Sequence, residues 1–169
     1  MTKTEKLLRE LIALPSVNPA FLPARNPYAG EQRVADFLAA TAARAGLDVE
    51  FQPVAKGRSN LLARLSPRGK VRQRVLLAPH LDTVNAADHQ FTPSKRNGRL
   101  FGRGACDTKG SVATMLTALC EMAEAGHRPA ETEITFAGLV DEEHSQAGSR
   151  ALVASGLSKM MSRTTSIPR

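Results

Sequence analysis

Three short polar clusters in this chain carry side chains able to bind metal ions and activate water. Residues 78–84 read APHLDTV, residues 102–110 read GRGACDTKG, and residues 140–149 read VDEEHSQAGS. Each cluster lies at the end of an apolar run or at the start of a helix-like segment. Because the chain has a formal net charge of +7, the gathering of a histidine with four carboxylates is best explained by bound cations. We therefore predict most of a two-metal hydrolytic site.

The first cluster places His80 and Asp82 two residues apart. On an extended strand end, this spacing directs both side chains to one side. A neutral imidazole is a good zinc ligand, and a nearby carboxylate can accept its other ring N–H and fix the tautomer. The alternative is an ordinary hydrogen-bonded pair at the surface, and the spacing alone does not separate the two.

The second cluster holds Asp107 between Gly104 and Gly110, ahead of a helix-like segment. Glycines permit a tight turn with close backbone approach, and a helix N-terminus favours negative charge. One interpretation is a carboxylate that bridges two cations with one oxygen to each. The other is a helix cap, since Asp107, Thr108 and Ser111 are all capping residue types.

The third cluster follows an apolar run and contains Asp141, Glu142 and Glu143 in succession. Three adjacent acids repel one another, so they are best tolerated in water or beside a cation. Adjacent residues point in different directions, so one acid can bind metal while the other takes a proton from a water. A solvated acidic turn is the alternative.

The apolar pattern predicts the elements that position these clusters. Helices are expected at residues 2–13, 30–45, 111–125 and from 146 to 154. Strands are expected at residues 47–54, 60–65, 75–79 and 134–140. The last two are continuous apolar runs, which indicate strands buried on both faces of a largely parallel sheet in an α/β layer sandwich. His80 and Asp141 follow these two strands, at the carboxyl ends where such sheets bind ligands.

Composition restricts the other classes of function. Apolar stretches are too short for a membrane span, and the N-terminal segment is amphipathic, unlike a secretory signal. Two cysteines, Cys106 and Cys120, make no disulfide framework, so we expect a cytoplasmic protein with no membrane partner. Seven basic residues and no acid lie between residues 56 and 74, yet they lack interleaved aromatics or a nucleic-acid motif. We interpret them as a solvated surface, not a nucleic-acid site.

Together, the motifs HLDTV at 80–84, GRGACDTKG at 102–110 and DEE at 141–143 resemble a family of zinc-dependent amidohydrolases and exopeptidases. This family includes acetylornithine deacetylase, succinyl-diaminopimelate desuccinylase, aminoacylase and glutamate carboxypeptidase. The resemblance covers about residues 1–157. It implies a zinc-exopeptidase-like catalytic domain, a three-layer α/β sandwich with a largely parallel central sheet that is incomplete at the C-terminal end.

The resemblance also implies a role for each matching residue. His80 would bind one metal, Glu143 the other, and Asp107 would bridge both. Glu142 would be the general base, and Asp82 would support His80. The cofactor would be two zinc ions, with cobalt or manganese also compatible. The reaction would be hydrolysis of an amide bond in an N-acyl amino acid, or of a C-terminal peptide bond in a short peptide.

Several family features are missing from the sequence. Members are much longer, carry a further acidic ligand and a late histidine ligand, and are often homodimers through an inserted dimerisation domain. We therefore expect residues 1–157 to be the N-terminal portion of the catalytic domain, residues 158–169 to be an irregular, non-native or frameshifted tail, and the dimerisation domain to be absent. With so few ligands, we expect a weakly active or inactive fragment; a dead remnant or non-enzymatic binding module is the alternative.

Overall fold

The computed structural model describes residues 1–23 and 25–156, and its central sheet has four strands. Their order across the sheet is β1 (Asp48–Ala55), β2 (Arg58–Leu65), β6 (Thr132–Gly138) and β3 (Gln73–Leu77). β1 pairs antiparallel with β2, β2 pairs antiparallel with β6, and only β3 and β6 are parallel. The prediction of a largely parallel sheet is therefore wrong for these strands. Only Lys56 and Gly57 join β1 to β2, and a connection this short makes an antiparallel hairpin.

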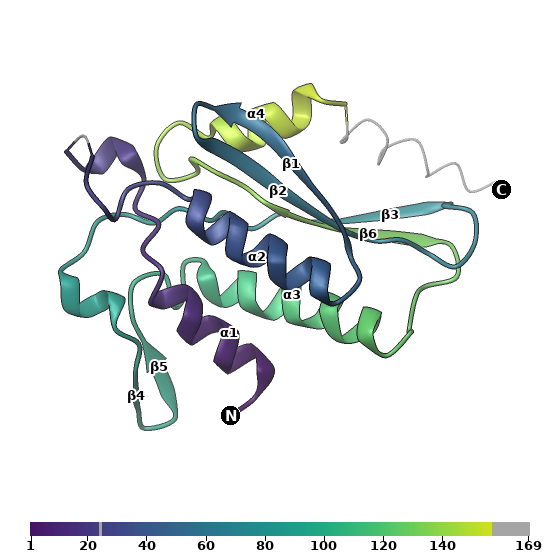
Figure 1. Ribbon diagram of the computed structural model, residues 1–169, viewed down its shortest axis with the longest axis horizontal. Coiled ribbons are helices and arrows are strands. Elements are labelled where there is room, and N and C mark those ends of the chain that lie inside the picture. Colours follow the sequence, from purple (N-terminus) through teal and green to yellow (C-terminus); the bar gives the residue numbers. More distant parts are fainter. Residues whose placement is uncertain (24, 157–169) are drawn as a thin grey trace, which may run out of the picture.

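Helices cover both faces of this sheet, so the predicted α/β sandwich is confirmed (Figure 1). The helices are α1 (Lys3–Ile12), α2 (Gln32–Arg44), α3 (Lys109–Glu124) and α4 (Ala147–Ala154). On one side α2 packs on β1 and β2, while α3 contacts β6 and α1 packs on α3. On the other side α4 contacts β1 and β2. The predicted irregular tail, residues 158–169, lies outside the described residues.

Two apolar cores fill the spaces between these layers. The larger core lies between the sheet and helices α1, α2 and α3, and fully buried members include Leu11, Leu38, Leu61 and Phe136. The smaller core lies on the other face and includes Leu62 of β2 and Leu152 of α4. Leu61 and Leu62 are neighbours that enter different cores because successive strand residues face opposite sides of a sheet.

Strand β3 differs from its prediction. The apolar run 75–79 was expected to be buried on both faces, yet Val75 is 36% exposed. β3 pairs with β6 on one side, and no strand among residues 1–23 and 25–156 pairs with its other side. The faces of a strand are buried by the helices packed on them, and these helices pack mainly on β1, β2 and β6. An apolar run therefore does not by itself show that both faces of a strand are covered, and this is why the prediction failed.

A small hairpin was not predicted from the apolar pattern. It consists of β4 (Ser94–Arg96) and β5 (Arg99–Phe101), which pair antiparallel across Asn97 and Gly98. Both turn residues have positive φ, 50° and 75°. Asn-Gly is the preferred sequence for a two-residue hairpin turn that needs this backbone conformation. The signal was therefore present in the sequence.

The basic run between residues 56 and 74 is largely neutralised by ion pairs. Four of its arginines pair with carboxylates: Arg58 with Glu31, Arg64 with Glu50, Arg72 with Glu131, and Arg74 with Glu133. The exposed Arg72 fits the interpretation as a solvated surface, but Arg58 pairs with the fully buried Glu31, so that interpretation is wrong for Arg58. In the part of the chain that the structure describes, no helix has the length and apolar character to cross a membrane.

Helix α4 docks very closely on the sheet, and Gly148 permits that approach. A Cβ at Gly148 would lie 2.4 Å from the carbonyl oxygen of Val140 and 2.6 Å from Oδ1 of Asn60. We expect Gly148→Ala to lower the free energy of unfolding by about 1–3 kcal/mol, because the helix must move off the strand end. Denaturant unfolding followed by circular dichroism measures this. Arg150→Ala, on an exposed position of the same helix, is the control and should change stability by about 0.5 kcal/mol or less.

Candidate metal centre

His80, Asp107 and Glu143 converge on one point of the structure. One ligand atom of each lies within 4.8 Å of the others, and His80 Nε2 is 3.0 Å from Asp107 Oδ1. His80 follows β3, Glu143 follows β6, and Asp107 lies in the loop before α3. Because β3 and β6 are parallel, their carboxyl ends meet at one edge of the sheet. The three residues predicted to bind metal are therefore close in space, while metal binding itself stays a prediction.

Backbone pairing continues past the end of β3 and fixes the position of His80. Leu139 N donates to Pro79 O at 2.9 Å, and Leu81 N donates to Leu139 O at 2.7 Å. His80 thus lies in an isolated bridge with Leu139, and 12% of its side chain is exposed. The imidazole is held on a backbone that has little freedom to move.

Asp82 is buried beside His80 and joins the first cluster to the third. Its Oδ1 accepts from Glu142 N and its Oδ2 from Glu143 N, both at 3.0 Å. The same Oδ1 lies 3.4 Å from His80 Nδ1. Burial alone would raise the pKa of Asp82, but hydrogen bonds from His80, Asn18 and these two amides lower it below its usual range. The nearest acceptor to His80 Nδ1 is the backbone carbonyl oxygen of Asp82 at 3.1 Å, with the ionised carboxylate beside it. The support of His80 by Asp82 stays a prediction.

Nearby negative charge raises the pKa values of both His80 and Glu143. Burial opposes protonation of His80, yet its contacts with Asp82 and Asp107 and the charge of Glu142 raise the pKa of the imidazole to about 9. Burial, together with the charges of Asp107, Asp82 and Glu142, raises the pKa of Glu143 despite attraction to His80. A divalent cation would relieve both effects. Nitrogen and carboxylate oxygen ligands also suit zinc, so the residues fit the predicted metal.

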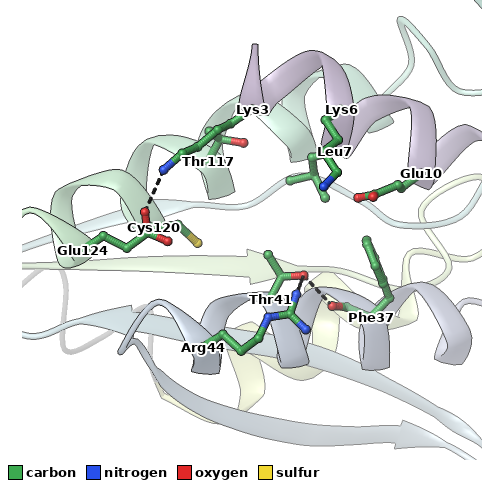
Figure 2. A pocket seen from close by; sticks show the side chains of 10 residues that line it. All are labelled: Lys3, Lys6, Leu7, Glu10, Phe37, Thr41, Arg44, Thr117, Cys120 and Glu124. Atoms are coloured by element: carbon green, nitrogen blue, oxygen red, sulfur yellow. Dashed lines mark hydrogen bonds and ion pairs between the residues drawn. The ribbon is translucent and has the colours of Figure 1, made fainter. Parts of the chain in front are cut away.

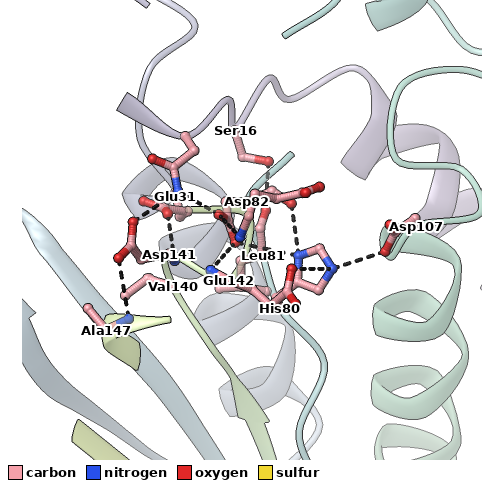
Figure 3. A network of polar contacts seen from close by, with 12 residues as sticks. Ser16, Glu31, His80, Leu81, Asp82, Asp107, Val140, Asp141, Glu142 and Ala147 are labelled. Atoms are coloured by element: carbon pink, nitrogen blue, oxygen red, sulfur yellow. Dashed lines mark hydrogen bonds and ion pairs between the residues drawn. The ribbon is translucent and has the colours of Figure 1, made fainter. Parts of the chain in front are cut away.

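Glu142 is placed beside the three candidate ligands and is half-exposed. Its Oε2 lies 3.8 Å from His80 Nε2, and 48% of its side chain is exposed. Figure 3 shows Glu142, His80 and Asp107 grouped at the strand ends. A carboxylate in this position can contact both a water at the cluster and bulk solvent. This is the arrangement that the predicted general base needs.

The loop that carries Asp107 is packed tightly against the end of α1. A Cβ at Gly102 would lie 2.4 Å from Ile12 Cγ2, and one at Gly104 would lie 2.9 Å from Lys109 Cδ. Lys109 is buried, and its Nζ donates to the carbonyl oxygens of Leu11 and Leu14 at the C-terminal end of α1. These contacts confirm the close backbone approach expected from the glycines.

The capping interpretation of this loop receives no support. Thr108 is the N-cap residue of α3 but makes no side-chain capping hydrogen bond. The Asp107 side chain is 78% exposed and contacts His80 instead.

A buried polar network lies behind the cluster, and the sequence patterns did not predict it. Glu31 is fully buried; it pairs with Arg58 and accepts a hydrogen bond from Asp141 N at 3.1 Å. Arg58 Nη1 also lies 3.1 Å from Asp141 Oδ1. Figure 3 shows Glu31 and Asp141 of this network. Asn18 donates to both Asp82 and Asp141. No sequence signal marked these residues, because Arg58 lies in a basic run and Asn18 in a proline-rich loop.

Asp141 has a role different from its two acidic neighbours. It is buried and faces the network, while Glu142 and Glu143 face the cluster. Burial would raise the pKa of Asp141, but hydrogen bonds from Ser145, Asn18 and Ala147 N, with the charge of Arg58, hold it far below the usual range. The acidic turn is thus anchored at its first residue.

A groove of about 370 Å³ lies elsewhere, among α1, α2 and α3 (Figure 2). Leu7, Phe37 and Cys120 contribute apolar surface, and Lys3 pairs with Glu124 at its edge at 2.7 Å. None of the five residues predicted for the metal site lines this groove. It is separate from the candidate centre.

Removing Arg58 should be strongly destabilising. Arg58→Met leaves the buried carboxylates of Glu31 and Asp141 without their cationic partner, so we expect a loss of about 3–5 kcal/mol in the free energy of unfolding. Arg64→Met is the matched control on the same strand, because Arg64 pairs with the exposed Glu50 and should cost about 1 kcal/mol or less. Urea unfolding of both variants gives the comparison. Equal losses would contradict the assignment of a buried network.

Zinc binding should depend on pH through His80. Because the pKa of the imidazole is raised to about 9, a proton occupies it at neutral pH and must leave before the nitrogen can bind metal. Between pH 6 and 8 we expect zinc affinity to rise by up to about tenfold per pH unit. Isothermal titration in buffers of different ionisation enthalpy measures the proton released. An affinity independent of pH would show that His80 is not a ligand.

Sequence comparisons identify relatives of this chain. Residues 76–164, slightly more than half of the chain, match the model of Peptidase family M20/M25/M40. A succinyl-diaminopimelate desuccinylase of Variovorax paradoxus is 33% identical, covering 93% of this chain and 40% of that protein. An acetylornithine deacetylase of Photorhabdus laumondii is 31% identical, covering 89% of this chain and 38% of that protein. The chain spans about two fifths of the length of these relatives.

Solved structures share the fold. Human carnosine dipeptidase 1 superposes with a TM-score of 0.71 at 23% identity, over 90% of this chain and 35% of that one. The aminopeptidase PepT of Bacillus cereus gives a TM-score of 0.71 at 21% identity, over 89% of this chain and 39% of that one. With the family match and the converging site, the resemblance seen in the three motifs is confirmed: the chain belongs to the peptidase family M20/M25/M40.

Proposed function

We propose that this chain carries part of the site of a metal-dependent hydrolase that cleaves an amide bond. The observation that carries the proposal is the convergence of His80, Asp107 and Glu143 within 4.8 Å, with Glu142 beside them. His80 and Glu143 would each hold one of two zinc ions, and Asp107 would contact both. When bound, the ions would polarise the amide carbonyl and make a nearby water acidic.

The chain's own residues would then move the proton. Glu142, half-exposed and beside the cluster, accepts a proton from the attacking water and returns it to the leaving amine. Asp82 holds the Nδ1 side of His80, with its backbone oxygen 3.1 Å and its Oδ1 3.4 Å from Nδ1, so that Nε2 faces the cluster. The amides of Glu142 and Glu143 donate to Asp82, and this keeps both side chains directed to the site.

The substrate class is proposed as an N-acyl amino acid. Relatives with 31–33% identity are named as a succinyl-diaminopimelate desuccinylase and an acetylornithine deacetylase, and both names describe removal of an acyl group from an amino acid. Cleavage of short peptides is the second candidate, because structures with the same fold include dipeptidases. Location in the cytoplasm stays a prediction.

We propose that activity of these 169 residues alone is weak. In the described part of the chain, each metal would have one ligand of its own plus the shared Asp107. Catalytic zinc usually has about three protein ligands, so affinity should fall well below that of a complete site. A chain that binds metal without hydrolysis would match the alternative, a non-enzymatic remnant.

Glu142→Gln should lower the hydrolysis rate by about 10²–10⁴-fold, because the amide cannot accept the proton from water. The assay follows amine release from a panel of N-acetyl and N-succinyl amino acids with added zinc or cobalt. Zinc affinity should be retained, since Glu142 is not a proposed ligand. Glu133→Gln is the control: it removes a carboxylate of β6 that pairs with Arg74 of β3, and it should keep the rate of the unchanged chain. Equal rates for Glu142→Gln and the control would contradict this role.

A further inference from the structure

Asn18 lies at the centre of the network behind the metal cluster. It is fully buried, in the loop between α1 and the short helix at Pro19–Phe21. Its backbone N–H donates to Thr83 O at 2.9 Å, and its Oδ1 accepts from Ala20 N at 3.1 Å. These bonds fix both the backbone and the orientation of the side-chain amide. Nδ2 is therefore held in one direction, toward the strand ends.

Both hydrogens of this amide are used on carboxylates. Nδ2 donates to Asp82 Oδ2 at 2.7 Å and to Asp141 Oδ1 at 3.0 Å. The two acids follow different strands and are separated by 59 positions in the numbering (141 − 82), yet one nitrogen contacts both. Both are at least 97% buried, so water does not replace the amide as a donor. An asparagine fits because it has two N–H donors and adds no charge.

Asp82 transmits this contact to the cluster. Its oxygens accept from the amides of Glu142 and Glu143 and lie beside the ring of His80. A shift of Asp82 would therefore alter the orientation of His80 and of the acidic turn together. Asp141, the second carboxylate on Asn18, anchors the start of the same turn.

We infer that Asn18 is a positioning residue for the metal centre: its amide clamps Asp82 and Asp141 and so sets the geometry of His80 and Glu143. The inference rests on the proposed function, since it assumes that His80 and Glu143 bind metal. Replacement of a residue that hydrogen-bonds a metal ligand directly commonly changes metal affinity by about 10–100-fold. Asn18 contacts Asp82, which in turn lies beside the ligand His80, so Asn18 acts one contact further out and its effect should lie near the lower end of that range.

Asn60 provides a matched control. It is also fully buried, its Nδ2 donates to Gln52 Oε1 and Gly148 O, and its Oδ1 accepts from Val140 N. It therefore makes as many side-chain hydrogen bonds as Asn18 and lies near the same turn. None of its side-chain bonds goes to Asp82 or Asp141. Loss of Asn60 should affect folding in a similar way without releasing either carboxylate.

The experiment is a titration with cobalt(II) alone, read by its visible ligand-field absorption, on the unchanged chain and three variants. Asn18→Ala removes the amide, Asn18→Leu keeps the branched shape but removes both N–H donors without adding charge, and Asn60→Ala is the control. We expect both Asn18 variants to weaken cobalt binding by about tenfold, the lower end of the range for direct partners of ligands, and to change the shape of the spectrum. Asn60→Ala should stay within about twofold of the unchanged chain. Thermal unfolding of the metal-free proteins is measured alongside.

The outcomes distinguish the proposed metal function from the positioning role of Asn18. If the unchanged chain binds no cobalt, the proposed metal function fails. If it binds, and the Asn18 variants bind with the same affinity and spectrum, only the inference about Asn18 fails. The inference is also overturned if the losses of affinity follow the losses of thermal stability equally in Asn18→Ala and Asn60→Ala, or if both Asn18 variants unfold where Asn60→Ala folds.

Discussion

Asp82 and Asp141 place two carboxylates next to each other inside the protein, both within hydrogen-bonding distance of the amide nitrogen of Asn18. Buried charges need protein donors because they have lost their hydration. Here the donors come from segments that are distant in sequence: the loop after α1, strand β2 through Arg58, and the backbone of the turn after β6. The hydrogen bonds and ion pairs that these two carboxylates require fix how the segments meet. Every candidate metal ligand lies on one of these segments or packs against one.

A network of this kind is weak evidence for stability. An apolar core of similar volume is often at least as stable as a buried ion pair, and removal of one partner is what costs most. The more informative feature of this protein is the neighbouring cluster of His80, Asp107 and Glu143, where negative charge is not balanced. The pKa of His80 is raised to about 9 and the pKa of Glu143 is also raised. A cation is the group that would balance both.

The mixed sheet explains how such a site can be built from separate segments. Parallel pairing of β3 with β6 brings two strand ends to one edge, and the isolated bridge at His80 extends that pairing by a few residues. The tightly packed loop before α3 then adds Asp107 from the side. Membership of the peptidase family M20/M25/M40 agrees with a site assembled in this way from three short motifs.

The sequence by itself determined the local features: four helices, the main strands, and the three clusters with His80, Asp107 and Glu143. Apolar periodicity, glycines and motif spacing are properties of neighbouring residues, so they can be recognised without a fold. Tertiary structure alone decided that the sheet is mostly antiparallel among the described strands, that β3 lies at its edge there, and that Asn18, Glu31 and Arg58 form a buried network behind the cluster. Those features depend on which distant segments meet, and burial of charge is decided only where they do.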